Sequence, residues 1–190
     1  PGTVEFDPYL PAPSSPDVAL YIPSSKIQLA TGATSITVPI MFRSFPGALA
    51  SVAFSVDYDQ SCLEMPANGW SNVLAGMDSL IKLNNADTAG ELDVAVWDPG
   101  ALQMPDGKLL DMTFNIKPSC TSSFVAFVLF GGTPPVSCGD TAGQSAACSA
   151  IDALIPVEFN ANPTFTPTSL SVNENVPAGT VVGTFVGSDP

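Results

Sequence analysis

Two runs of alternating apolar residues follow each other between Thr34 and Asp59, and they constrain the fold more than any other feature of the chain. The first run places four large apolar side chains on one side of an extended strand: Ile36, Val38, Ile40 and Phe42. The second run, after a break at residues 44–47, does the same with Val52, Phe54, Val56 and Tyr58. Alternation of period two is typical of a strand with one buried face, and such faces are buried against a second sheet. The pattern therefore predicts a β-sandwich.

Further strands are predicted on both sides of these runs. Residues 91–98, ELDVAVWD, alternate with Leu92, Val94 and Val96 facing inward. The residues of this strand that face outward are Glu91, Asp93, Ala95 and Trp97. Residues 108–117 alternate again, and residues 123–130 are apolar on both faces, which indicates a strand that something covers on both sides. With a last strand at 155–159, about seven to nine strands are expected, which is typical of an all-β sandwich or jelly roll.

Residues 71–83 leave two alternatives open. Val73, Leu74 and Met77 recur at helical spacing behind a possible Ser71 cap, which predicts a short helix. A loop with a strand at its end is equally compatible with the same residues.

The distribution of proline and the length of 190 residues indicate one domain with two tails. Residues 1–17 hold five prolines and little periodicity, so they are expected to form an extended arm. Residues 18–159 form the predicted sandwich, and residues 160–190 follow it.

The charge of the chain excludes several classes of function. There are 18 acidic and 5 basic residues and no histidine. A polyanion is repelled by nucleic acids and by anionic lipids, and the chain has no run of apolar residues long enough to span a membrane. A hydrolytic triad needs a base such as histidine. Asp57 and Asp59 could pair as in a glycosidase, but a turn-forming role at the strand end is the better interpretation, so no enzymatic activity is predicted.

Four cysteines are expected to form disulfides, because none is spaced as in a zinc site. The favoured pairing is Cys62 with Cys120 and Cys138 with Cys148, although four cysteines allow three connectivities. The second pair would close a loop rich in glycine, serine and alanine. Disulfides indicate an oxidising compartment, which predicts an extracellular or cell-surface location.

Four motifs in sequence order resemble those of the cohesin family. They are TSITVPI, then ALASVAFSVDYD with CLEM, then GELDVAVWD, and then PDGKLLDMTFNIK. The resemblance covers about residues 18–159 and implies a nine-stranded jelly roll of bacterial or archaeal extracellular proteins. In cellulosomes such domains bind dockerins through the outer face of one sheet, and similar domains occur in surface and adhesion proteins.

Residues 160–190, NANPTFTPTSLSVNENVPAGTVVGTFVGSDP, carry a second resemblance, to the start of a cadherin repeat. In that family the glutamate of the E-N pair and the aspartate of the D-P pair belong to calcium sites between domains. The resemblance implies that Glu174 and Asp189 take these roles. Asn160 and Asn162 stand where cadherin linkers usually carry aspartates. Calcium is therefore a possible cofactor.

One face of the predicted sandwich is a candidate protein-binding surface, because its residues are small or apolar where a solvated face is usually charged. The candidate residues are Ser51, Ala53, Ser55, Asp93, Ala95, Trp97, Val125 and Phe127. The alternative is that a loop of the same chain covers this face. Trp70 and Trp97 could also stack on a sugar ring, so a carbohydrate-binding module is a second possibility.

Taken together, these features predict a non-catalytic interaction module of a secreted surface or filament-forming protein. Its partners are expected to be copies of itself or neighbouring domains of one long chain. Assembly would use the sheet face or strand exchange, in which the tail or residues 2–10 add a strand to the next subunit. The alternative is a carbohydrate-binding or dockerin-binding module of an extracellular system that degrades polysaccharides.

Overall fold

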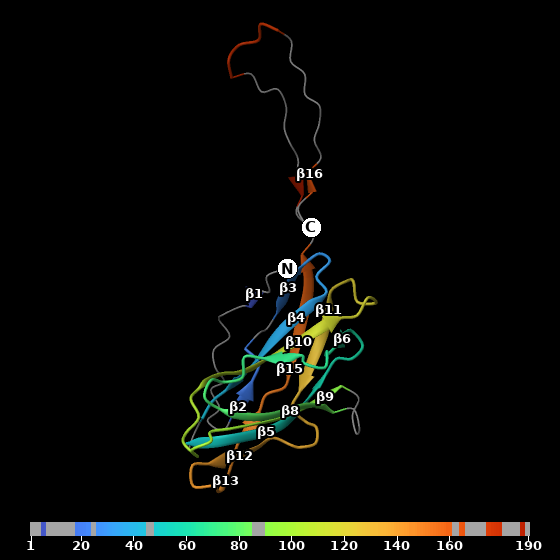
Figure 1. Cartoon of the computed structure of the whole chain (residues 1–190). Helices are drawn as coiled ribbons and strands as arrows, with labels where there is room; N and C mark the ends of the chain where they lie inside the picture. Colours follow the sequence, from blue (N-terminus) through green and yellow to red (C-terminus); the bar gives the residue numbers. More distant parts are fainter. Residues whose placement is uncertain are drawn as a thin grey trace.

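The computed structural model describes residues 5–6, 18–23, 26–44, 48–84, 90–160, 164–165, 174–179 and 187–188. Across these ranges the chain forms strands, turns and irregular segments but no helix (Figure 1). Two sheets pack as a sandwich around a single core, as the alternating patterns predict. Within the described ranges no helix is long and apolar enough to cross a membrane.

The first sheet is built around β5 (Leu49–Tyr58), which has neighbours on both sides. One side of β5 pairs with β9 (Glu91–Trp97), and β9 pairs in turn with β8 (Asp78–Asn84). The other side pairs with β11 (Phe124–Leu129) near one end of β5 and with β12 (Ser137–Asp140) near the other. The sheet continues from β12 to β13 (Ser145–Ala146), and from β11 through β15 (Ala153–Asn160) and β3 (Ile27–Ala30) to β1 (Glu5–Phe6). All these pairs are antiparallel except β15 with β3.

The second sheet has the order β14 (Ser149–Ala150), β2 (Val18–Tyr21), β4 (Ser35–Phe42), β10 (Gly107–Ile116) and β6 (Leu63–Glu64). A further strand, β7 (Trp70–Ser71), also pairs with β10. The longest pairing in this sheet joins β10 to β4. These are two of the strands whose alternation is clearest in the sequence.

The core lies between the inner faces of the two sheets. Phe42 and Phe114 from the second sheet and Phe54 from the first are at most 1% exposed. The rings of Tyr58 and Phe114 have centroids 4.8 Å apart, and those of Phe54 and Phe130 are 5.7 Å apart. Each fully buried aliphatic or phenylalanine side chain contributes about 1.5–3 kcal/mol to the free energy of unfolding. Burial of the alternating faces therefore stabilises the sandwich.

Residues 71–83 do not form the helix that was one of the two alternatives. The segment leaves β7 at Ser71, makes a turn in which the Leu74 carbonyl accepts the Met77 N–H at 3.2 Å, and enters β8 at Asp78. All of β8 pairs with β9. The loop-and-strand alternative is therefore correct, because the ladder to β9 satisfies backbone groups that a short isolated helix would leave marginal.

Both expected disulfides are present. Cys62 and Cys120 have Cα atoms 5.5 Å apart, and Cys138 and Cys148 have Cα atoms 6.1 Å apart. Cys138 lies in β12 of the first sheet, whereas Cys148 directly precedes β14 of the second. The second disulfide therefore links the two sheets through the segment between them.

In the C-terminal segment, β16 (Thr164–Phe165) pairs with β17 (Gly187–Ser188) in a small sheet of its own. Figure 1 shows the turn at residues 174–179 at the far end of this segment, beyond the sandwich. The remaining residues expected to form cadherin-like strands lie outside the described ranges, and so do residues 7–17 of the N-terminal arm. The cadherin resemblance stays a prediction.

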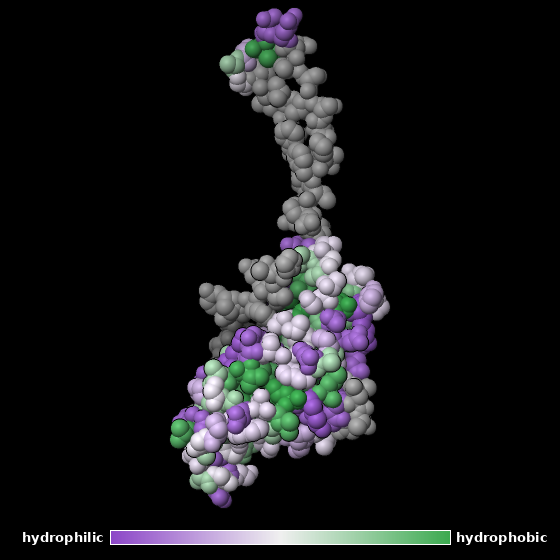
Figure 2. Space-filling view, in the orientation of Figure 1, coloured by the Kyte–Doolittle hydropathy of each residue, from purple (hydrophilic) through white to green (hydrophobic). Residues whose placement is uncertain are grey.

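Several large apolar side chains remain on the surface of the described part of the chain. In the space-filling view of Figure 2, apolar residues gather midway along the sandwich among polar ones. The exposed large apolar residues are Leu80, Trp97, Leu102, Val125, Ile151, Leu154 and Val176. Four of them, Leu80, Trp97, Val125 and Leu154, lie on strands of the first sheet, so its outer face is the surface to consider.

Candidate protein-binding surface

Cross-strand pairing arranges the outer face of the first sheet in rows. Ser51 lies opposite Trp97, Ala53 opposite Ala95, and Ser55 opposite Asp93. On the other side of β9, β8 places Asp78, Leu80 and Lys82 opposite Trp97, Ala95 and Asp93. Since side chains of directly opposed residues point to the same face, six of the predicted partner-binding residues share one surface.

Residues 131–136, which join β11 to β12 and are called the strap here, cross part of this surface. The Ser55 hydroxyl donates a hydrogen bond to the Pro134 carbonyl at 2.6 Å. Gly132 lies so close to the sheet that a Cβ atom there would overlap Glu91 Oε2 and would lie 2.9 Å from Ser55 Oγ. Directly before the strap, Asp152 Oδ1 accepts the Phe130 N–H at 2.7 Å. The strap is thus held against the sheet by the hydrogen bond to Ser55 and by the close approach of Gly132 to Glu91.

The strap buries polar residues that would otherwise face solvent. Ser55 and Glu91 are 0% exposed and Asp93 is 8% exposed, although all three point to the outer face. Asp93 Oδ2 accepts hydrogen bonds from Lys82 Nζ and Asn84 Nδ2, each at 3.1 Å. The open alternative, that a loop of the same chain covers the face, therefore applies to Ser55, whereas the contacts of Asp93 are with Lys82 and Asn84 of β8. The alternative does not apply to Ser51, Ala53, Ala95 and Trp97, which are at least partly exposed.

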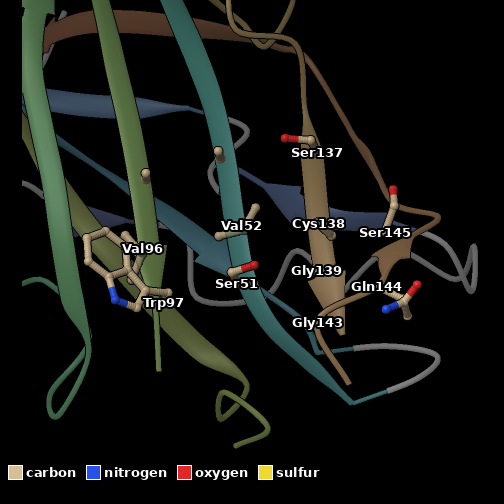
Figure 3. Close-up of a pocket in the computed structure, with 12 residues that line it drawn as sticks. Ser51, Val52, Val96, Trp97, Ser137, Cys138, Gly139, Gly143, Gln144 and Ser145 are labelled. Atoms are coloured by element: carbon tan, nitrogen blue, oxygen red, sulfur yellow. The ribbon is translucent and has the colours of Figure 1, made fainter. Parts of the chain in front are cut away.

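Beside the strap the sheet is hollowed. One hollow of about 260 Å³ lies among Ala53, Ala95, Leu80, Lys82 and Pro134. An adjoining one of about 420 Å³ shares Ala53 and Ala95 and extends between Trp97 and the β12–β13 hairpin. Figure 3 shows Trp97, Ser51 and Ser137 around this second hollow, with Gln144 and Ser145 of the hairpin on its far side. Small residues on the floor and larger ones at the border make this region concave, and the two hollows together are called the groove here.

A second apolar area lies across the strap from the groove. Val125 pairs with Pro156 and Phe127 with Leu154, and Val125 and Leu154 are 57% and 70% exposed. On β5, Leu129 of β11 lies opposite Asp57, and Ser137 of β12 lies opposite Ala53. The strap, which runs from β11 to β12, therefore lies between this area and Ala53. Residues 125 and 127 therefore do not join the other predicted residues in one continuous surface. Leu154 was missed from the sequence, although the inward pattern of Ile155 and Val157 places it outward.

The two tryptophans differ in exposure. Trp97 is 36% exposed at the border of the groove, whereas Trp70 is partly buried and packs against the core. Only Trp97 of the two is therefore placed for contact with a ligand. Asp59, considered above with Asp57, is 5% exposed, and its Oδ1 accepts the Ser61 N–H at 2.9 Å. This contact agrees with the turn-forming role expected of Asp59.

The residues expected to bind calcium are only partly described. Glu174 is exposed in the turn at 174–179, and the Asn160 carbonyl accepts hydrogen bonds from the N–H and hydroxyl groups of Thr31. Asn162 and Asp189 lie outside the described ranges. Among the residues that the structure describes, no group of three or more acidic, histidine or cysteine side chains could hold a metal ion. Calcium binding by the tail stays a prediction.

Comparison with known proteins gives a clear result for structure only. No protein-family model and no curated protein sequence matches the chain. The sixth cohesin of Acetivibrio cellulolyticus scaffoldin B, solved with a Cel5 dockerin, superposes with a TM-score of 0.55 at 21% identity, over 74% of this chain and 97% of that one. The fold of the sandwich is that of a cohesin module.

Two further cohesins give the same picture. The OlpC cohesin of Clostridium thermocellum, solved with a dockerin, has a TM-score of 0.57 at 16% identity, over 78% of this chain and 99% of that one. A non-cellulosomal cohesin from Archaeoglobus fulgidus has a TM-score of 0.55 at 15% identity, over 73% and 89% of the two chains. The cohesin resemblance found in the sequence is thus confirmed for the fold.

Proposed function

We propose that this cohesin-like domain is a non-catalytic protein-binding module of a secreted surface or filament-forming protein. The observation that carries the proposal is the groove, where Ala53, Ala95 and Leu80 leave an apolar hollow on an outer sheet face beside the exposed Trp97. Such a surface is unfavourable in water unless a partner covers it. Cohesins of the same fold that were solved with dockerins support a protein as the partner.

An extracellular location follows from the disulfides in this proposal. Two disulfides and no free cysteine in the described residues are typical of proteins from an oxidising compartment.

Affinity capture with matched baits tests the proposal. Three baits are used: the wild-type chain, Ala53→Lys and Leu102→Lys. Each bait is incubated with the secreted proteins of the organism that produces this chain, and the captured proteins are quantified by mass spectrometry. Ala53→Lys places a charge on the floor of the groove and is expected to abolish capture of the partner. Leu102 is 67% exposed in the loop after β9, so its replacement controls for adding a lysine to the surface. If every captured protein is retained equally by all three baits, the groove is not the binding site.

A second proposal, assembly of copies by strand exchange, has its own support. In the described part of the chain, the N-terminal β1 is the outermost strand of the first sheet and pairs with β3 at Glu5 and Phe6. An outermost strand leaves an edge on which a strand of another copy could add. Deletion of residues 163–190 is expected to leave a folded monomer that no longer assembles, as seen by negative-stain microscopy. A truncated chain that forms the same polymer would contradict this route, and so would an intact chain that stays monomeric at high concentration.

Carbohydrate binding at the groove and calcium binding by the tail are each tested by a separate measurement. Trp97 at the border of the groove favours carbohydrate as a second candidate ligand, and strong binding on a glycan array that is lost in Trp97→Ala would support it. Calcium binding by the tail predicts heat on titration of the intact chain with CaCl₂ that disappears in Glu174→Ala.

A further inference from the structure

The strap limits how much of the sheet face a partner can cover. Along β5, the groove is lined by the outward residues Ser51 and Ala53, because Leu49 is buried in the core. The strap covers the next outward residue, since the Pro134 carbonyl accepts a hydrogen bond from the Ser55 hydroxyl and Gly132 lies against Glu91. Two residues of a strand span about 7 Å, so this stretch accommodates one secondary-structure element of a partner and not two side by side. On the far side of the strap the exposed Val125 belongs to a separate surface.

The floor of the groove offers this element no backbone hydrogen bonds. The floor strands β5 and β9 are interior, because β5 pairs with β9 and β12, and β9 pairs with β5 and β8. β8, which lines one side of the groove, is the outermost strand on that side of the described sheet. A partner segment seated on the floor cannot add there as a further strand. It must bind through side-chain contacts, and the apolar space between Leu80 and Pro134 accepts one aliphatic side chain.

The charged side chains around the groove are predominantly acidic. Asp78 is exposed and directly opposite Trp97, Asp98 follows Trp97, and Asp140 ends β12 beside Gly139 of the groove. The basic residue that lines the groove, Lys82, pairs with Asp93 at 3.1 Å. The whole chain has a formal charge of −13. A second copy that presented its own acidic surface would be repelled here, whereas a basic partner would be attracted.

We propose that the groove binds one basic segment of a different protein, with an aliphatic side chain seated beside Pro134 and cationic side chains facing Asp78 and Asp140. The proposal rests on the proposed protein-binding function and adds the charge and the width of the partner. Copies of this chain are then excluded from the groove, although strand exchange elsewhere in the molecule is not.

A displayed library of random 16-residue peptides, selected against the intact chain at about 50 mM NaCl, tests this proposal. The enriched peptides are expected to carry net positive charge and at least one aliphatic residue, and to bind several-fold more weakly at about 300 mM NaCl. Ala53→Lys should abolish their binding. Asp78→Asn should weaken it by about two- to fivefold, as for an exposed ion pair. Glu64→Gln removes one charge on β6 of the second sheet and should leave binding unchanged.

The possible outcomes separate the two proposals. Neutral or acidic peptides that require Ala53 would overturn the basic partner and leave the protein-binding groove intact. Absence of binders, or binders that ignore Ala53→Lys, would overturn both. Peptides that bind equally well to Asp78→Asn and show no salt dependence would contradict the electrostatic part of the inference.

Discussion

At the scale of single residues, the fit of the strap onto the sheet depends on Gly132. A methyl group there would overlap the buried Glu91 carboxylate and press on Ser55, so Gly132→Ala is expected to lower the free energy of unfolding by about 1–3 kcal/mol. Gly131→Ala is the matched control, since nothing lies within 4 Å of a Cβ atom at that position. Urea unfolding of the two variants measures the difference. Equal losses would mean that the strap does not pack against β5 and β9 as described.

Tyr58 gives a second prediction at this scale. Burial raises the pKa of the Tyr58 hydroxyl, and the hydrogen bond that it accepts from the Met65 N–H at 3.3 Å acts in the opposite direction. An unfolded tyrosine ionises at about pH 10, whereas the folded one stays neutral to higher pH. The free energy of unfolding is therefore expected to fall as the pH rises above about 10.

Comparison with Tyr58→Phe separates the contribution of Tyr58 to this pH dependence from that of the lysine side chains, which titrate in the same pH range. The difference in unfolding free energy between wild type and variant, measured in urea, should be constant up to about pH 9 and should shrink above about pH 10. A difference that does not change with pH would contradict the burial of the hydroxyl.

At the scale of elements, the two disulfides are expected to have different effects. The chain-entropy account assigns about 4 kcal/mol to the Cys62–Cys120 disulfide and about 3 kcal/mol to Cys138–Cys148, because the second closes a shorter loop. The short second loop supplies Gly139, Gly143, Gln144 and Ser145 to the groove and is closed by its disulfide, whereas the groove residues of the first loop, such as Ala95 and Trp97, are held by the pairing of β9 with β5 and β8. Replacing Cys138 and Cys148 by alanine should therefore weaken partner binding more, and replacing Cys62 and Cys120 should lower stability more. Urea unfolding measures the stability of both variants, and a binding assay measures their affinity for the partner. A larger loss of affinity on removal of Cys62–Cys120, or a larger loss of stability on removal of Cys138–Cys148, would contradict this prediction.

Elements also show what could be predicted from the sequence. The alternation in β4, β5, β9 and β10 reports local packing on one side of a strand, so their inward faces were predictable. The strap was not, because its contacts join Pro134 to Ser55 and Gly132 to Glu91 across a long stretch of sequence. The sequence therefore left open whether Ser55 lies on an exposed face or under a loop of the same chain. The apolar residues of segment 71–83 are compatible both with helical spacing and with a loop followed by a strand. The pairing of β8 with β9 decides for the strand, and this pairing is a contact between distant residues that the local pattern does not report.

At the scale of the whole molecule, the sandwich presents one face with a narrow apolar groove among acidic groups. The fold is shared with cohesins at 11–21% identity, so it is set by the buried alternation and not by the surface residues. The strap, the β12–β13 hairpin and the acidic border are features of this chain's surface, and partner choice is expected to depend on them.

The most direct test of the central claim is the dissociation constant of the captured or selected partner for three forms of the intact chain. Ala53→Lys should raise it at least about tenfold, because a lysine side chain would fill the hollow that the partner's side chain occupies and would repel the partner's cationic side chains. Leu102→Lys should leave it within about twofold of wild type, as expected of an exposed surface position. If both variants bind as wild type does while remaining folded, the groove is not the partner site.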